Sequence, residues 1–381
     1  MSAMEYKKQL SGLRVAIVHD WLVGLGGGER VVQSMLKLFP QAEIYTSVYN
    51  PKELKLFKQQ IVHSSFIQRW PLALKKHQLY SMLRPLAFES FDFSAYDLVI
   101  STCSAESKGI ITPSETLHIA YLFTPTRYYW SGYQDYLEEP GFGPLDPLAR
   151  LMLRNSIGSL RQWDFAAAQR PDEIVSISTE VSKRTKKYYK RSSLVIYPPV
   201  DTDKFTGLSS SRSKDNYYLI LGRLIGYKRV DLAVRACTEL GLELVVAGRG
   251  PEEKALRKIA GPTIRFIKSP SDQEAKELYA NCRAFVFPGL EDFGITPVEA
   301  MAAGKPVICF AKGGATETVI DGVTGIYHSQ QTVESLVEAI QKFQKTSFDK
   351  KEIVKRAKMF SEDRFLSELG GYVVGKISQK K

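Results

Sequence analysis

Apolar and polar positions alternate along this chain in short blocks from one end to the other. A buried-strand pattern, Leu13 to Val18, precedes a helical pattern from Glu29 to Phe39, in which Val32, Met35 and Leu36 recur at helical spacing. The same order of a short apolar run and an amphipathic segment repeats toward the C-terminus. Strands that alternate with helices predict an α/β fold with doubly wound parallel sheets.

One stretch near the middle of the chain interrupts this alternation. Pro198 and Pro199 precede a polar run from Gly207 to Asp215, a composition typical of a linker. The length of 381 residues also suits two domains. We therefore expect two doubly wound domains that face across a cleft, and a C-terminal helix or tail that packs back on the first. The expected parts are residues 1–200, 201–365 and 366–381.

The most informative stretch runs from Ala284 to the strand at Val307. A short buried strand ends at Pro288, a polar loop follows, and Thr296 begins a helix with Pro297 at its first position. A loop at the carboxyl end of a strand, leading into a helix N-terminus, is where open α/β sheets bind phosphates. From the residues alone, an ordinary strand–loop–helix unit with solvated carboxylates remains an alternative.

Cysteine content and hydropathy set the expected compartment. The four cysteines are far apart and lack metal-ligand spacing, so we expect buried thiols in a reducing compartment. No apolar run approaches the length of a transmembrane helix. We expect a cytoplasmic protein, either free or docked peripherally on the inner face of the cell membrane.

The formal net charge of +11 leaves four explanations open: a polyanionic substrate, an anionic membrane surface, nucleic acid, or solubility alone. Residues 51–91 mix lysine and arginine with aromatic and leucine side chains, which suits either a membrane-surface contact or a helical insert packed on its own domain. Residues 183–191 are strongly basic, as a solvated helix face often is. No zinc spacing, helix-turn-helix or RNA-motif signature supports nucleic-acid binding.

Several motifs, taken in order, resemble one enzyme family. Glu291 and Glu299 form an E-x7-E pair, and Arg223 with Lys228 follows a strand–glycine end upstream. Together with the run Val246 to Pro251 and the glycines at 313–314 and 322–325, these motifs resemble glycosyltransferase family 4. The resemblance implies a retaining enzyme with the GT-B fold of two Rossmann-like domains, and it covers about residues 13–365.

Motifs in the N-terminal half narrow the resemblance. They are similar to the branch that contains bacterial O-antigen mannosyltransferases; the matching segments are residues 19–22, 26–30, 39–40, 44–46, 124–128 with Trp130, and 197–201 with Phe205. One departure is Phe123, which stands where related sequences usually have a histidine. Another is Lys268, where a glycine is more common.

The resemblance implies transfer of a hexose, mannose from GDP-mannose, to a lipid-linked or polysaccharide acceptor in cell-envelope glycan synthesis. A UDP-sugar donor is the alternative within the same reaction class, and a basic nucleic-acid-binding protein is the alternative from another class. The resemblance implies no metal and no cofactor, since protein cations stabilise the leaving diphosphate. Because that phosphate can itself take the acceptor proton, the absence of a histidine at Phe123 is tolerable.

The same resemblance assigns candidate site residues. Arg223 and Lys228 suit a diphosphate, Glu299 would bind the ribose hydroxyls, and Glu291 would contact the hexose. Asp20 could bind an acceptor hydroxyl or cap its loop, and Arg127 could hold an acceptor phosphate or a structural salt bridge. The expected catalytic residues are Glu291, Arg223 and Lys228; the donor-binding residues are Gly27, Gly28, Gly222, Gly248, Ser271, Phe293, Gly294, Ile295, Thr296 and Glu299; the acceptor-binding residues are Asp20, Arg127 and Tyr128.

Overall fold

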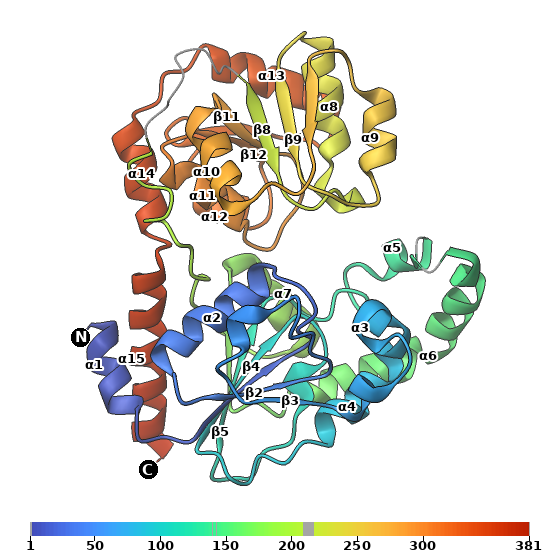
Figure 1. Cartoon of the computed structure of the whole chain (residues 1–381), viewed down its shortest axis with the longest axis vertical. Helices are drawn as coiled ribbons and strands as arrows, with labels where there is room; N and C mark the ends of the chain where they lie inside the picture. The colour runs from blue at the N-terminus through green and yellow to red at the C-terminus, as the bar shows by residue number, and fades with distance from the viewer. Residues whose placement is uncertain (1, 139, 142, 209–216, 381) are drawn as a thin grey trace. The chain divides into compact units, whose positions relative to one another are not determined.

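The computed structural model describes residues 2–138, 140–141, 143–208 and 217–380, and it divides into two compact units (Figure 1). The first unit contains Met1–Tyr197 and Phe365–Lys381, and the second contains Pro198–Arg364. The polar run expected as a linker lies outside the described residues from position 209 onward.

The first unit is built on a seven-stranded parallel sheet with the order β3-β2-β1-β4-β5-β6-β7. Its central strands are buried along their whole length, as expected where helices cover both faces of a parallel sheet. The strands are β1 (Val15–His19), β2 (Glu43–Thr46), β3 (Val62–Ser64), β4 (Leu98–Cys103), β5 (Leu117–Leu122), β6 (Glu173–Ser176) and β7 (Leu194–Val195).

Helices surround this sheet, and the C-terminal helix is one of them. Phe365 packs edge-on against Tyr121, with ring centroids 5.7 Å apart, and Tyr372 donates a 2.8 Å hydrogen bond to Glu173. The helices are α1 (Ala3–Leu10), α2 (Gly27–Leu38), α3 (Ala73–Lys76), α4 (Arg84–Glu89), α5 (Tyr133–Glu138), α6 (Asp146–Ala167), α7 (Thr179–Tyr189) and α15 (Glu362–Lys380).

The segment 51–91 departs most from regular structure. It holds the short edge strand β3, the helices α3 and α4, and three 3₁₀ turns: η1 (Lys55–Phe57), η2 (Phe66–Arg69) and η3 (His77–Leu83). A fourth and a fifth 3₁₀ turn, η4 (Ser107–Gly109) and η5 (Gly143–Leu145), lie later in the unit. Such short turns leave no helical or strand period in the sequence.

The second unit has a six-stranded parallel sheet with the order β10-β9-β8-β11-β12-β13. Its strands are β8 (Tyr218–Leu221), β9 (Leu244–Ala247), β10 (Ile264–Ile267), β11 (Ala284–Phe287), β12 (Val307–Phe310) and β13 (Gly325–His328). Its helices are η6 (Gly226–Lys228), α8 (Val230–Glu239), α9 (Glu253–Ile259), α10 (Asp272–Asn281), α11 (Ile295–Ala302), α12 (Ala315–Thr318), α13 (Val333–Gln344) and α14 (Lys350–Lys358). The predicted α/β class with two parallel sheets is thus confirmed.

All four cysteines, Cys103, Cys237, Cys282 and Cys309, are buried and unpaired. Burial raises the pKa of the Cys237 and Cys282 thiols to about 12, so both are protonated at neutral pH. These thiols are therefore small apolar core groups rather than nucleophiles or metal ligands.

Candidate active site

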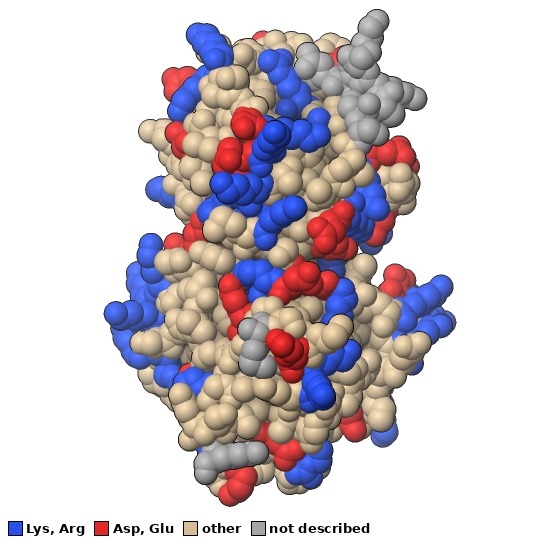
Figure 2. Space-filling model, turned by 90° about the vertical axis from the view of Figure 1, so that its left-hand side faces the viewer, with Lys and Arg blue, Asp and Glu red and all other residues tan. Residues whose placement is uncertain are grey.

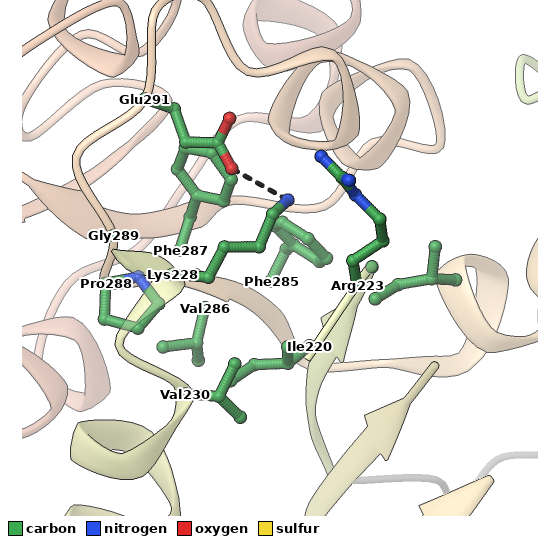
Figure 3. A pocket seen from close by; sticks show the side chains of 12 residues that line it. Ile220, Arg223, Lys228, Val230, Phe285, Val286, Phe287, Pro288, Gly289 and Glu291 are labelled. Carbon is green, nitrogen blue, oxygen red and sulfur yellow. Dashed lines mark ion pairs between the residues drawn. The ribbon is translucent and has the colours of Figure 1, made fainter. Parts of the chain in front are cut away.

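A pocket in the second unit opens where β8 and β11 end, at the carboxyl edge of the sheet (Figure 3). Chain order reverses at this point, since β8 pairs with β9 on one side and β11 on the other. Open α/β sheets bind ligands at such a switch point. The pocket floor is apolar, and its polar side chains come from Arg223, Lys228 and Glu291.

Lys228 and Glu291 form an ion pair inside this pocket. Lys228 lies in η6, after β8, and its Nζ is 2.7 Å from Oε1 of Glu291, which lies in the loop after β11. The two side chains are only 19% and 18% exposed, so solvent screens the pair incompletely. Figure 3 shows the Lys228 ammonium between the Glu291 carboxylate and the Arg223 guanidinium.

Arg223 differs from Lys228 in having no ion pair with a described carboxylate. The residue is exposed and follows Gly222 directly after β8. A guanidinium at this position presents its planar fork of donors toward the pocket and can bind two phosphate oxygens at once. The structure therefore places both predicted cations in one pocket with the predicted carboxylate.

Close backbone contacts fix the loops around this pocket. Gly248, at φ +149°, packs on Gly222 so tightly that a Cβ would lie 1.8 Å from the Gly222 carbonyl oxygen. At Gly289 a Cβ would lie 2.7 Å from Cα of Lys228 and 2.9 Å from its carbonyl oxygen. Glycine is therefore required at both positions by the approach of a neighbouring loop. The second contact sets the position of Lys228 against β11.

The helix after the Glu291 loop begins slightly earlier than predicted. It starts at Ile295 with Gly294 as its N-cap, at φ +91°, so Pro297 is the third helical residue rather than the first. The first turn has no intrahelical acceptors for its N–H groups, so a proline here sacrifices no hydrogen bond. The free N–H groups of this turn, including that of Thr296, face the N-terminal end of the helix, where anions bind favourably.

Glu299 lies in the same helix and is only 7% exposed. Tyr279, a fully buried residue of α10, donates a 2.9 Å hydrogen bond to its Oε2. This contact orients the carboxylate. Tyr279 could not be found from the sequence, because an aromatic residue next to Leu278 on a helix is indistinguishable from a core residue.

Two further donor-binding predictions have structural contacts of their own. Phe293 is buried and packs against Phe360, with ring centroids 5.6 Å apart. Ser271 is the N-cap of α10: its Oγ accepts from the Glu274 N–H, and the Glu274 carboxylate accepts from the Ser271 N–H. Neither side chain lines the pocket described above.

In the first unit, Gly27 and Gly28 begin helix α2, and Gly26 is its N-cap. The Gly26 N–H donates a 2.9 Å hydrogen bond to Oε2 of Glu29. A Cβ at Gly28 would lie 3.1 Å from Cε1 of His19 and 3.4 Å from the ring of Phe123. The glycine loop therefore lies directly against the residue that replaces the expected histidine.

His19 itself is a polar group that the sequence interpretation did not assign. Its Nδ1 lies 2.8 Å from the hydroxyl of Thr102, and that hydroxyl donates to the Val18 carbonyl at 3.2 Å. Nε2 lies 3.8 Å from Oε1 of Glu29, beside the glycine loop. Its position at the end of a predicted strand, where ligands bind in parallel sheets, could have identified His19 from the sequence.

Asp20 has a structural role in this fold. It is 1% exposed, and its carboxylate accepts hydrogen bonds from the N–H groups of Ser104, Ala105 and Ser107 at 2.7–3.0 Å and from the Ser104 hydroxyl at 3.1 Å. These contacts fit the loop-capping alternative and occupy both carboxylate oxygens.

Tyr128 belongs to a hydrogen-bond network with Arg84 and Glu106, and Arg127 precedes it in the chain. The Tyr128 hydroxyl accepts from Arg84 at 2.8 Å and donates to Glu106, which also pairs with Arg84 Nε at 2.9 Å. Burial raises the pKa of Tyr128 well above its ordinary value. Arg127 is half-buried and packs along Gly132, where a Cβ would lie 2.9 Å from its Cγ.

Comparison with known proteins agrees with this geometry. Residues 201–360, which contain the whole pocket, match the family model of glycosyl transferases group 1. The chain is 23% identical to the alpha-1,3/1,6-mannosyltransferase ALG2 of Dictyostelium discoideum, over 93% of this chain and 94% of that protein. It is 31% identical to a GDP-mannose-dependent alpha-(1-6)-phosphatidylinositol monomannoside mannosyltransferase of Mycobacterium tuberculosis, over 54% and 66% respectively.

Among solved structures, the fold is similar to that of Anabaena HepE, a protein crystallised with UDP and glucose. The TM-score is 0.67 at 16% identity, covering 96% of this chain and 99% of that one. The two parallel-sheet units are thus those of the GT-B fold. Residues 201–360 form a glycosyl transferases group 1 domain, and the chain is a glycosyltransferase.

Within the described residues, none of the helices combines the length and the apolar character that a membrane span requires. The same residues contain no group of three or more histidine, cysteine, aspartate or glutamate side chains placed to hold a metal ion.

Proposed function

We propose that the protein is a retaining mannosyltransferase of glycosyltransferase family 4 that moves mannose from GDP-mannose to a lipid-linked or polysaccharide acceptor in cell-envelope glycan synthesis. The observation that carries the proposal is the pocket at the ends of β8 and β11, where Arg223 and Lys228 lie beside Glu291. The GDP-mannose dependence of the mycobacterial relative supports the choice of donor. The O-antigen branch rests on the N-terminal motifs.

The proposed reaction breaks the bond between the anomeric carbon and the diphosphate, and the bonding electrons leave with GDP. Arg223 and Lys228 stabilise the negative charge that grows on the phosphate, a contribution worth about 10²–10³ in turnover for one donor. An acceptor hydroxyl attacks the same face of the sugar, and its proton passes to the leaving phosphate. Glu291 holds Lys228 and stabilises the cationic character of the sugar. No metal or cofactor takes part in this proposal.

The remaining groups position the two substrates. Glu299, oriented by Tyr279, binds the ribose hydroxyls, and the N–H groups at the start of α11 bind phosphate. These groups of the second unit bind the donor, and Gly27 and Gly28 of the first unit are further donor-binding residues in this proposal. The side chain of Arg127, also in the first unit, serves the acceptor. A lipid-linked acceptor implies that the protein works peripherally on the inner face of the cell membrane.

The donor is tested by thermal shift of the purified chain with GDP, UDP and ADP and their sugars. We expect GDP and GDP-mannose to raise the melting temperature, with a stabilisation of about 2.7 kcal/mol at a hundredfold excess over Kd. The measurement is repeated in EDTA to test metal independence. A shift with UDP alone would replace GDP-mannose with a UDP-sugar. Anomeric proton coupling in the product then reports whether configuration is retained.

A further inference from the structure

Large apolar side chains are exposed on two segments of the first unit that lie far apart in the sequence. Residues 66–86 expose Trp70, Leu72 and Met82, and residues 145–152, at the start of α6, expose Leu148 and Leu151. Leu72, Leu148 and Leu151 are each more than half exposed, at 57%, 54% and 56%. Each leaves apolar area in water that folding alone does not remove.

We call these exposed side chains together the apolar–basic face. Within residues 66–86, Trp70 packs against Tyr80 with ring centroids 5.3 Å apart. Met82 Sδ lies 4.0 Å from the hydroxyl of Ser156, which lies in α6 one turn beyond Met152. Trp163, farther along α6, donates a 2.8 Å hydrogen bond to Glu89 at the end of α4. α6 therefore packs against this segment through its later turns, and Met152, Leu151 and Leu148 extend from the Met82 contact toward the start of the helix.

The charge on this face has one sign along most of its length. Between Glu53 and Glu89 the sequence contains lysine and arginine but no aspartate or glutamate. Arg84 is buried in its pair with Glu106, so the exposed cations are those such as Lys75 and Lys76, next to Leu72 and Leu74. Figure 2 shows, from another direction, basic and acidic side chains interspersed on both units.

We infer that the apolar–basic face docks the protein on an anionic phospholipid bilayer. Apolar side chains can enter the boundary between head groups and acyl chains, while the long lysine stems let their ammonium groups reach the lipid phosphates. The basic helix α7 offers charge without this apolar component, because none of its side chains is a large exposed apolar group. The inference deepens the peripheral location proposed above and rests on it, but it does not depend on the donor.

The test is flotation of the full-length protein with vesicles of phosphatidylcholine alone or mixed with phosphatidylglycerol, at low and at high salt. We expect binding only to the mixed vesicles, weakened by salt because the Debye length shortens. The charge reversal K75E/K76E should lower the partition coefficient at least about 25-fold, since each lysine near an anionic surface contributes about fivefold. Its matched control is K186E/K187E, an exposed lysine pair on α7.

The apolar part of the face is tested with Met152→Glu, which should weaken binding on the order of tenfold. Leu194→Glu is its matched control, because both native side chains are 47% exposed and Leu194 lies in edge strand β7, away from the face. Near-ultraviolet circular dichroism and the GDP-induced thermal shift show that each variant is folded. Loss of binding in K75E/K76E and M152E, with both controls unchanged, supports the inference.

Other outcomes overturn it. If the protein does not float with phosphatidylglycerol vesicles at low salt, membrane docking is excluded. If only K186E/K187E loses binding, the lipid-binding surface is α7. If all four variants lose vesicle binding equally, the binding depends on the net charge of the whole protein and not on the apolar–basic face. A dimer that Met152→Glu dissociates, with no lipid binding, makes the face an interface between copies of this chain. Lipid binding without any nucleotide response would reject the proposed function and leave the docking face standing.

Discussion

Removal of the Lys228 ammonium separates its catalytic role from its role in stability. In Lys228→Ala, Glu291 loses the partner that lies 2.7 Å away in a pocket where both side chains are about four-fifths buried. The unfolding free energy should fall by about 1–2 kcal/mol, between the effect of an exposed pair and that of breaking a fully buried one. Turnover should fall about 10²–10³-fold, because the leaving diphosphate loses one of its two cations.

A double-mutant cycle with Glu291→Gln isolates the ion pair. Urea unfolding gives its contribution to stability, and initial rates at saturating GDP-mannose give its contribution to turnover. In the double variant the stability losses should be less than additive, because no uncompensated carboxylate is left. If Lys228→Ala lost 1–2 kcal/mol of stability but kept its turnover within threefold, Lys228 would be a structural residue and the proposed mechanism would lose its second cation.

Three further predictions concern other groups. Gly289→Ala forces the backbone of Lys228 to move, so it should weaken GDP binding at least about tenfold, whereas Gly226→Ala, with nothing within 4 Å of its Cβ, should not; calorimetric titration compares them. Glu299→Gln should raise the KM for the donor with little change in kcat. Steady-state kinetics that show a lower kcat and an unchanged KM would contradict this. Burial lowers the pKa of His118 to about 3, so between pH 6.5 and 3 this side chain is protonated in the unfolded state but not in the folded state. As the pH is lowered through this range, the unfolding free energy should therefore decrease by about 1.4 kcal/mol per pH unit. In His118→Gln, urea unfolding at several pH values should show a shallower dependence.

The sequence was sufficient for the architecture because alternating apolar runs and amphipathic segments are a local property. The strand pattern from Leu13 to Val18 corresponds to β1, Val15–His19, and the helical pattern from Glu29 to Phe39 corresponds to α2, Gly27–Leu38. The irregular segment 51–91 could not be resolved in the same way. Its 3₁₀ turns and short strand β3 are held by tertiary contacts, not by a period in the chain.

In the candidate site, too, some residues could be predicted from the sequence and others could not. Arg223, Lys228 and Glu291 are adjacent to strand ends, and parallel topology brings the ends of β8 and β11 together, so motif order was enough to propose a common pocket. The contacts of Tyr279 with Glu299, and of His19 with Thr102, join helices and strands that the sequence cannot bring into register.

Asp20 shows the limit most clearly. A carboxylate just after a strand end fits both a ligand site and a loop cap, and only the positions of the N–H groups at 104, 105 and 107 distinguish them. Phe123 is the converse case, because its contacts with Gly28 and His19 become visible only when β1 and β5 are placed in one sheet.

The proposed function requires that the pocket between β8 and β11 binds a nucleoside diphosphate through Arg223 and Lys228. Isothermal titration of GDP into the wild-type protein and into the double variant R223A/K228A, with UDP as the comparison, tests it most directly. We expect saturable GDP binding that weakens at least about 100-fold in the double variant, since two charge-assisted contacts are lost. Unchanged GDP affinity in a folded double variant would contradict it.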